Sequence, residues 1–357
     1  MKFRLLLLIG LLWGGVTIAQ ENFRIPLDRV TLKFDGRLDY KNIHEEGNIS
    51  NRNVQGFQTS KMTIQTDIDI YKGLHFFYRQ QFKNYHNEPK DGLGGQIEKL
   101  GISYENKAWK ITVGKQWFCI GSYEQLYDPN DVYTYSGVNN MLPVWKTGVN
   151  VAYRFNKQEI GLQLVNGSES IDENKIFTQN DLYLNLYWYG SLANGRIIPM
   201  VNIASDLQPG QIGVISEIGA RWNFNRFKLD TDFAMVNNMR GATPDDVLYI
   251  STPIRLYYEG KHLRPGFKYI FDYQHNKSDV DLKHLPQDAK KHANTFQGFI
   301  NYYPYAEKDF NIHAVVAYAD NNLYEYTNGA KTAHNNYQKN WSFVIGIRFG
   351  FELFGNK

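Results

Sequence analysis

Apolar and polar residues alternate along most of the chain, and the first long example is residues 30–40. In this segment apolar side chains occupy every second position from Val30 to Tyr40, and charged side chains such as Lys33 and Arg37 lie between them. A period of two places successive side chains on opposite faces of a β-strand, so this strand has one apolar and one polar face. A strand needs about 9–11 residues to cross a lipid bilayer at a tilt. The pattern therefore predicts a membrane-crossing strand.

The same alternation recurs to the C-terminus. The expected strands are residues 30–40, 61–70, 74–83, 97–105, 108–118, 147–156, 158–166, 180–189, 196–205, 212–224, 227–237, 247–259, 263–274, 293–303, 310–319 and 340–354. The last is very regular, with Trp341, Phe343 and Ile345 beginning one apolar face. These segments amount to sixteen strands, an even number, as in bacterial outer-membrane barrels. We predict an all-β fold, a transmembrane antiparallel β-barrel of sixteen strands.

Short and long connections alternate between these segments. Short turns are expected at residues 71–73, 106–107, 156–157, 190–195, 225–226, 259–262 and 304–309. Long loops are expected near residues 41–57, 85–95, 119–146, 167–179, 206–211, 238–246, 275–292 and 320–339. Outer-membrane barrels have short periplasmic turns and long outer loops. A secreted β-sandwich would also show alternating strands, but it would not produce this regular succession of connections.

The N-terminal residues resemble an export signal. Lys2 and Arg4 precede an apolar run that ends before the small residues Thr17 and Ala19. This is the pattern of a cleaved secretory signal peptide over residues 1–19. We therefore expect a periplasmic N-terminal segment at residues 20–28, a barrel from residue 29 to residue 357, and a location in the bacterial outer membrane.

Composition agrees with a barrel and excludes several other classes. Aromatic residues make up 15% of the chain, yet its mean hydropathy is −0.48. A membrane barrel spreads such residues over its outer face and keeps polar residues inside. Without Lys2 and Arg4 the formal charge is 37 − 36 = +1, which gives no support to a nucleic-acid partner. Cys119 is the only cysteine, so no internal disulfide is expected.

The predicted lumen carries many charged side chains. Sixteen strands leave room for an aqueous channel, so small hydrophilic solutes or anions are the expected partners besides outer-membrane lipid. The candidate pore-lining bases are Arg37, Arg79, Lys83, Arg154, Arg221, Arg264, Lys268 and Arg348. Rings of such residues favour anions in anion-conducting pores. Interspersed acids would weaken this preference, and a polar wall that selects by size alone is the alternative.

The loop at residues 119–146 is the candidate constriction. It is long and rich in aromatic and acidic residues, and a loop of this kind is more often packed against the rest of the protein than flexible. The candidate constriction residues are Tyr123, Tyr127, Asp128, Asp131 and Tyr133. Folded inward, the loop would set the size limit of the pore, and its tyrosines could stack on sugar rings or only pack against the wall.

The overall layout resembles the phosphate-selective porin O and P family. The resemblance rests on Val113-Gly114-Lys115-Gln116-Trp117 leading to Gly121 and to Tyr127-Asp128-Pro129. It implies a homotrimer of sixteen-stranded barrels with an inward-folded third loop and lumenal Arg and Lys that guide anions. Two features depart from the family pattern: residues 119–142 contain no Lys or Arg, and Phe354 is followed by three more residues.

Two other classes of function remain open at this stage. An outer-membrane hydrolase would need a Ser–His or Asp–His pair at one rim. Most histidines fall in connections, and no GxSxG or HExxH motif occurs, so we expect no enzyme activity, no catalytic residue, no cofactor and no metal. An adhesin or scaffold barrel acting through its outer loops is the third reading. Bilayer conductance would separate a channel from both.

Overall fold

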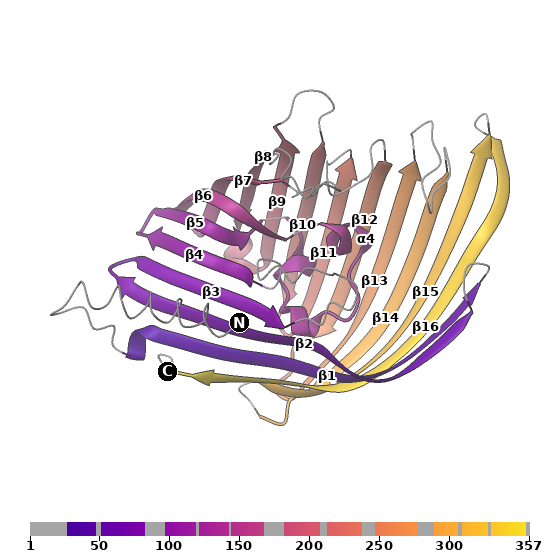
Figure 1. The fold of residues 1–357 in the computed structure, drawn as a ribbon, viewed down its shortest axis with the longest axis horizontal. Helices are drawn as coiled ribbons and strands as arrows, with labels where there is room; N and C mark the ends of the chain where they lie inside the picture. The colour runs from indigo at the N-terminus through magenta and orange to yellow at the C-terminus, as the bar shows by residue number, and fades with distance from the viewer. Residues whose placement is uncertain are drawn as a thin grey trace, which may run out of the picture.

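The computed structural model describes most of the chain after residue 26. The described residues are 27–47, 51–82, 97–118, 121–142, 144–167, 182–207, 213–237, 247–276, 289–305, 309–327 and 330–354. They form a closed sheet of sixteen antiparallel strands in which β1 pairs with β16 (Figure 1). This confirms the predicted fold class. The expected signal peptide, residues 1–19, lies outside the described residues, as does most of the segment 20–28.

Each strand pairs with its neighbours in the chain, so the barrel is an up-and-down meander. The first eight strands are β1 (Val30–Gly47), β2 (Arg52–Tyr71), β3 (Leu74–Phe82), β4 (Ile97–Glu105), β5 (Trp109–Trp117), β6 (Trp145–Phe155), β7 (Gln158–Asn166) and β8 (Leu182–Gly190). The second eight are β9 (Ile197–Asp206), β10 (Val214–Phe224), β11 (Phe227–Asn237), β12 (Val247–Tyr258), β13 (Leu263–Asn276), β14 (Lys290–Tyr302), β15 (Phe310–Thr327) and β16 (Ala330–Leu353). Closure pairs the backbone groups between strands and leaves no open edge.

The alternation seen in the sequence separates the two faces of the wall. In β4, for example, Leu100, Ile102 and Tyr104 are exposed on the outside, whereas Ser103 is buried on the inside. An apolar outer surface is costly in water and favourable in lipid. The strands therefore form because they can pair in a ring while presenting different chemistry to their two sides.

Two expected loops are corrected by the structure. Residues 41–57 and 320–339 were expected to be loops, but β1 and β2 stay paired as far as Glu45 and Arg52, and β15 pairs with β16 as far as Thr327. The reason is visible in β2, where residues 52–59 are exposed on both faces, apart from the half-buried Gly56. Where both faces of a hairpin meet water, polar residues occupy both, and the period of two disappears although the strands continue.

The short turns have the backbone expected of them. Asn156 and Lys157 have positive φ angles of 44° and 63°, and Asn225 has a φ of 57°. Two-residue hairpin loops need this left-handed conformation, which Asn tolerates better than most residues. The turn residues therefore assist the reversal between neighbouring strands.

The third loop lies inside the ring of strands. It contains three short helical turns: α3 (Tyr123–Leu126), η2 (Pro129–Asp131) and α4 (Gly137–Met141). Figure 1 shows α4 within the barrel near β11 and β12, and both α3 and α4 contact β11. A further turn, η1 (Leu27–Arg29), precedes β1. In the described part of the chain, no helix has the length and apolar character needed to span a bilayer.

Candidate functional site

The third loop is anchored to the wall opposite its origin. It leaves the barrel wall at the end of β5, and its buried Glu124 accepts hydrogen bonds from the backbone N–H of Ser136 and the side chain of Asn139. Lys268 of β13 donates to the Glu124 carboxylate and, at 2.6 Å, to the carbonyl of Thr134. The loop is thus folded on itself around Glu124 and is tied to the far wall by one buried lysine.

Carboxylates of the wall bind the backbone of the loop. Asp232 of β11 accepts hydrogen bonds from the N–H groups of Tyr123 and Glu124 at 3.0 and 3.1 Å. Asp272 of β13 accepts one from the N–H of Gly137 at 2.8 Å. These N–H groups begin the two short helices α3 and α4, where the first turn leaves donors without helical partners. The wall therefore completes the ends of both helices.

Arginines of β1, β13 and β16 bind the middle of the loop. Arg37 of β1 donates to the carbonyls of Asn130 and Val132 at 2.8 and 3.1 Å. Arg348 of β16 donates to Asp131 at 2.8 Å and to Asp128 at 2.5 Å, and Arg264 of β13 lies 3.4 Å from Asp131. The loop therefore crosses the lumen and packs on β9–β16 and β1.

The loop tyrosines pack against this wall. The hydroxyls of Tyr123 and Tyr133 donate to the carbonyl of Ile198 at 2.6 Å and to Asn301 at 2.9 Å. Tyr127 donates to Asp230, and Arg255 lies over its ring at 4.1 Å. Burial, followed by the nearby Asp230, raises the pKa of Tyr127 well above its ordinary value. The hydroxyl therefore stays protonated and remains a donor to Asp230.

A cavity of about 740 Å³ remains between the loop and the wall formed by β2–β6. Its basic side chains come from four neighbouring strands and are Lys61 of β2, Arg79 of β3, Lys99 of β4 and Lys115 of β5. Its acids are Glu98 and Asp128. Arg79 lies 2.9 Å from Glu98, and Asp128 is paired with Arg348. The cavity is therefore bordered by more positive than negative charge.

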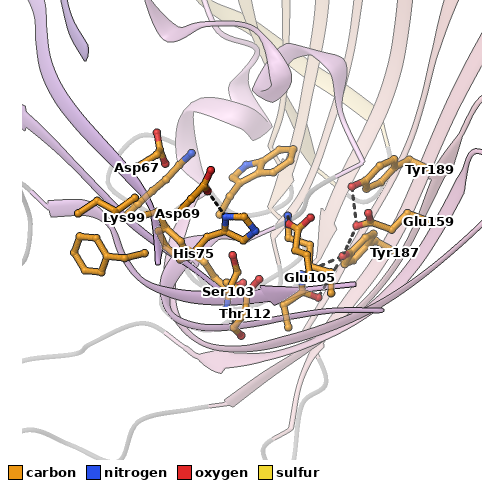
Figure 2. A pocket seen from close by; sticks show the side chains of 17 residues that line it. Asp67, Asp69, His75, Lys99, Ser103, Glu105, Thr112, Glu159, Tyr187 and Tyr189 are labelled. Atoms are coloured by element: carbon orange, nitrogen blue, oxygen red, sulfur yellow. Dashed lines mark hydrogen bonds and ion pairs between the residues drawn. The ribbon is translucent and has the colours of Figure 1, made fainter. Parts of the chain in front are cut away.

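A second cavity of about 410 Å³ adjoins the first, and both are lined by Lys99 and Trp117. Figure 2 shows Asp67, Asp69 and His75 on one side of it and Glu159, Tyr187 and Tyr189 on the other. The two cavities lie along the same strands, one beside the loop and one nearer the turn between β2 and β3. They form a passage along the wall that the loop leaves uncovered.

Two acids of the second cavity are already neutralised. Arg154 donates to Glu105 at 2.8 Å and to Glu159 at 2.6 Å, and Lys110 lies 2.9 Å from Glu105. Tyr189 also donates to Glu159, at 2.7 Å. These groups form a closed network on the wall, so they add little net charge to the passage.

The eight pore-lining candidates fall into distinct groups. Arg79 lines the cavity beside the loop, Arg154 lies in the network just described, and Lys83 is outside the described residues. The other five contact the loop or the side chains that hold it: Arg37, Arg221, Arg264, Lys268 and Arg348. Among the constriction candidates, Tyr127 and Asp128 border the cavity beside the loop, whereas Tyr123, Asp131 and Tyr133 take part in its anchoring.

Lys99 was missed by the analysis of the sequence. The pairing of β3 with β4 shifts by one residue, so that Arg79 faces Lys99 and Gln80 faces Ile97. Because of this irregularity Glu98 and Lys99 both line the cavity, although they are adjacent. Lys99 keeps the alternation of Ser103 and Glu105, so the period of two already places it inside. The shift turns Glu98 inward as well, and no feature of the sequence marks it.

Comparison with known proteins supports the fold. No protein-family model and no curated protein matches the sequence. Among solved structures, the outer membrane channel DcaP of Acinetobacter baumannii has a TM-score of 0.62 at 11% identity, over 89% of this chain and 96% of that one. The anion-selective porin from Comamonas acidovorans has a TM-score of 0.58 at 15% identity, over 90% and 99%. OmpT of Vibrio cholerae has a TM-score of 0.57 at 12% identity, over 91% and 98%.

These likenesses establish a porin-like barrel of sixteen strands. At such low identities they concern the fold alone. The porin fold implied by the resemblance in the sequence is confirmed, while membership of the phosphate-selective porin O and P family stays a prediction.

Proposed function

We propose that this protein is an outer-membrane porin, a water-filled channel for passive diffusion of small hydrophilic solutes with a weak preference for anions. The observation that carries the proposal is the passage between the third loop and the wall of β2–β5, bordered by Lys61, Arg79, Lys99 and Lys115. A barrel of sixteen strands is wide enough to hold water. The loop narrows this channel, and its sequence contains neither of the catalytic motifs considered above.

The preference for anions follows from the charged side chains of the passage that form no ion pair. Glu98 is paired with Arg79, and Asp128 with Arg348 of the far wall. Lys99 forms no ion pair within the described ranges, and its ammonium lies 5.3 Å from the centre of the Trp145 ring. Basic groups around a narrow pore attract anions and repel cations. Phosphate or a similar small anion is the solute that the family resemblance suggests.

A homotrimer is the proposed assembly. One of the similar structures, OmpT of Vibrio cholerae, is described in a trimer form. Light scattering of the detergent-solubilised protein should give a mass of about three chains, the number that the family resemblance implies. A single-chain mass would contradict a stable trimer.

Planar-bilayer recording tests the channel and its charge preference together. The wild type should give stepwise currents and, in a salt gradient, a reversal potential on the anion-selective side. Replacing Lys99 and Lys115 by Gln should move this potential toward that of a non-selective pore, because two positive charges leave the passage. Lys228→Gln is the control, since Lys228 lies at the start of β11 and lines neither cavity.

Two results would count against the proposal. An absence of stepwise currents would remove the channel and favour an enzyme or an adhesin built on the same barrel. An unchanged reversal potential in the double variant would leave a pore that selects by size alone.

A further inference from the structure

Two opposite charges in the passage have no ion-pair partner in the described part of the chain. Lys99 lines both cavities, and its described contact is the Trp145 ring. Asp67 lines the second cavity and accepts a hydrogen bond from the Gln65 amide at 2.5 Å. Nearby acids and bases such as Glu105 and Arg154 are paired with each other, so Lys99 and Asp67 differ from their surroundings.

The strand pairing sets the distance between these two side chains. Gln65 faces Arg79 and Arg79 faces Lys99, whereas Asp67 faces Phe77, two residues further along β3. The backbones of Asp67 and Lys99 are therefore about 10 Å apart across two strand spacings and about 7 Å apart along the strands. Figure 2 shows both side chains at the same end of the cavity. They are near enough to act on one small solute, yet they do not pair with each other.

A residue of the same charge type lies beside each of them and is already in an ion pair. Arg79 of β3 lies next to Lys99 in the pairing of β3 with β4, and its guanidinium is 2.9 Å from Glu98. Asp69 follows Asp67 on the same face of β2, and its carboxylate is 2.5 Å from Nδ1 of His75. The passage thus has a basic section beside the loop and an acidic section beyond it.

We propose that the passage binds solutes in zwitterionic form, namely free amino acids and short peptides. Their carboxylate lies on Lys99, and their ammonium group lies on Asp67. This inference rests on the proposed channel function and names a solute class for it. A solute with only one charge finds an opposing charge in one of the two sections, whereas a zwitterion is favoured in both.

The dimensions and the wall suit a solute of this class. An extended peptide spans about 3.3–3.6 Å per residue, so a dipeptide or tripeptide separates its terminal charges by about 7–11 Å. Ser103, Thr112, Gln116 and Asn150 line the second cavity and offer hydrogen-bonding groups to peptide bonds. Trp117, shared by both cavities, offers an apolar surface to a side chain.

Solute flux into liposomes that contain the full-length protein tests this inference. Three probes of similar size are compared: glycylglycine, N-acetylglycylglycine, which keeps only the carboxylate, and glycylglycinamide, which keeps only the ammonium group. Glycylglycine should enter about threefold faster than either blocked form, which is the ratio expected for one additional exposed ion pair.

Variants identify the residues that are responsible. Lys99→Gln should slow glycylglycine and N-acetylglycylglycine but not glycylglycinamide, and Asp67→Asn should slow glycylglycine and glycylglycinamide but not the acetylated form. Lys228→Gln and Asp320→Asn are matched controls, because neither residue lines the passage. The charge exchange Lys99→Asp with Asp67→Lys should keep the preference for glycylglycine, since the zwitterion can bind in the reverse direction.

The outcomes separate this inference from the channel proposal. Equal entry of the three probes into wild-type liposomes would overturn zwitterion binding while leaving a working channel. A response to Lys99→Gln without any response to Asp67→Asn would indicate an anion site alone and would also overturn it. Entry of no probe, together with an absence of ionic current, would reject the channel itself.

Discussion

Two buried glutamates on the lumenal side of the barrel differ in how their charge is satisfied. Glu124 receives hydrogen bonds from Ser136 and Asn139 and is paired with Lys268. Glu217 of β10 is fully buried, and both its carboxylate oxygens lack a hydrogen-bond partner in the described part of the chain. Its charged neighbours include the acids Asp232 and Glu124. A buried charge without a partner costs free energy, whereas removing a satisfied one exposes its donors to the same cost.

We expect opposite effects from removing the carboxyl group at these two positions. Glu217→Met should raise the free energy of unfolding by about 1–3 kcal/mol, because it removes two buried oxygens that have no hydrogen-bond partner in the described part of the chain. Glu124→Gln should lower it by about 3–5 kcal/mol, because Lys268 then keeps a buried charge without its partner. Urea titration followed by the gel mobility of folded and unfolded barrels measures both. Destabilisation by Glu217→Met would show that the Glu217 carboxyl is satisfied by a partner.

At the scale of elements, the third loop is held as a strap across the lumen. Its three turns are short, and two begin with a capping side chain of the loop: Ser122 accepts from the N–H of Glu124 in α3, and Asp128 accepts from that of Asn130 in η2. The third, α4, is completed by Asp272 of the wall. Contacts from β1, β11, β13 and β16 then fix its position. The strap is therefore stable because the wall and the loop satisfy each other's hydrogen-bonding and charged groups. The size of the passage depends on these contacts.

Loss of the buried lysine should loosen this strap. Lys268→Met leaves the Glu124 carboxylate without its cation, a loss of about 3–5 kcal/mol for a buried pair. We expect larger and noisier single-channel currents than in the wild type. The double variant Lys268→Met with Glu124→Gln should recover quieter currents, because no buried charge is left unpaired. Steady wild-type currents from the single variant would mean that the other anchors suffice.

At the scale of the whole molecule, the passage is displaced to one side of the barrel. Loop contacts cover β9–β16 and β1, while the wall residues that line both cavities belong to β2–β8. The bases that hold the loop face acids at short range, and they add little to the field in the passage. Charge selectivity therefore depends on a few groups of the uncovered wall.

This arrangement makes selectivity sensitive to salt. The screening length falls from about 10 Å at 0.1 M salt to about 3 Å at 1 M. We expect the anion preference of the wild type to decrease strongly over this range, since the bases of the wall act across a water-filled gap. Reversal potentials at a fixed concentration ratio and rising mean concentration measure the effect. Selectivity that is independent of salt would point to direct binding of the anion instead.

The amino-acid sequence by itself determined the number of strands and the inner and outer faces of most of them, because side-chain period and turn chemistry are local properties. It did not reveal the long hairpins of β1–β2 and β15–β16, and in β2 the alternation is lost where residues 52–59 are exposed on both faces. The sequence also placed several arginines in the lumen, but it did not show that some of them hold the third loop. Arg37 and Arg348 are distant from residues 121–142 in the chain, and only the closed barrel brings them against the loop. The inward position of Glu98 was likewise decided by tertiary structure, since a one-residue shift between β3 and β4 turns it toward the passage beside Lys99. Strand formation follows from neighbours in the sequence, whereas the lining of the passage follows from contacts between residues far apart in it.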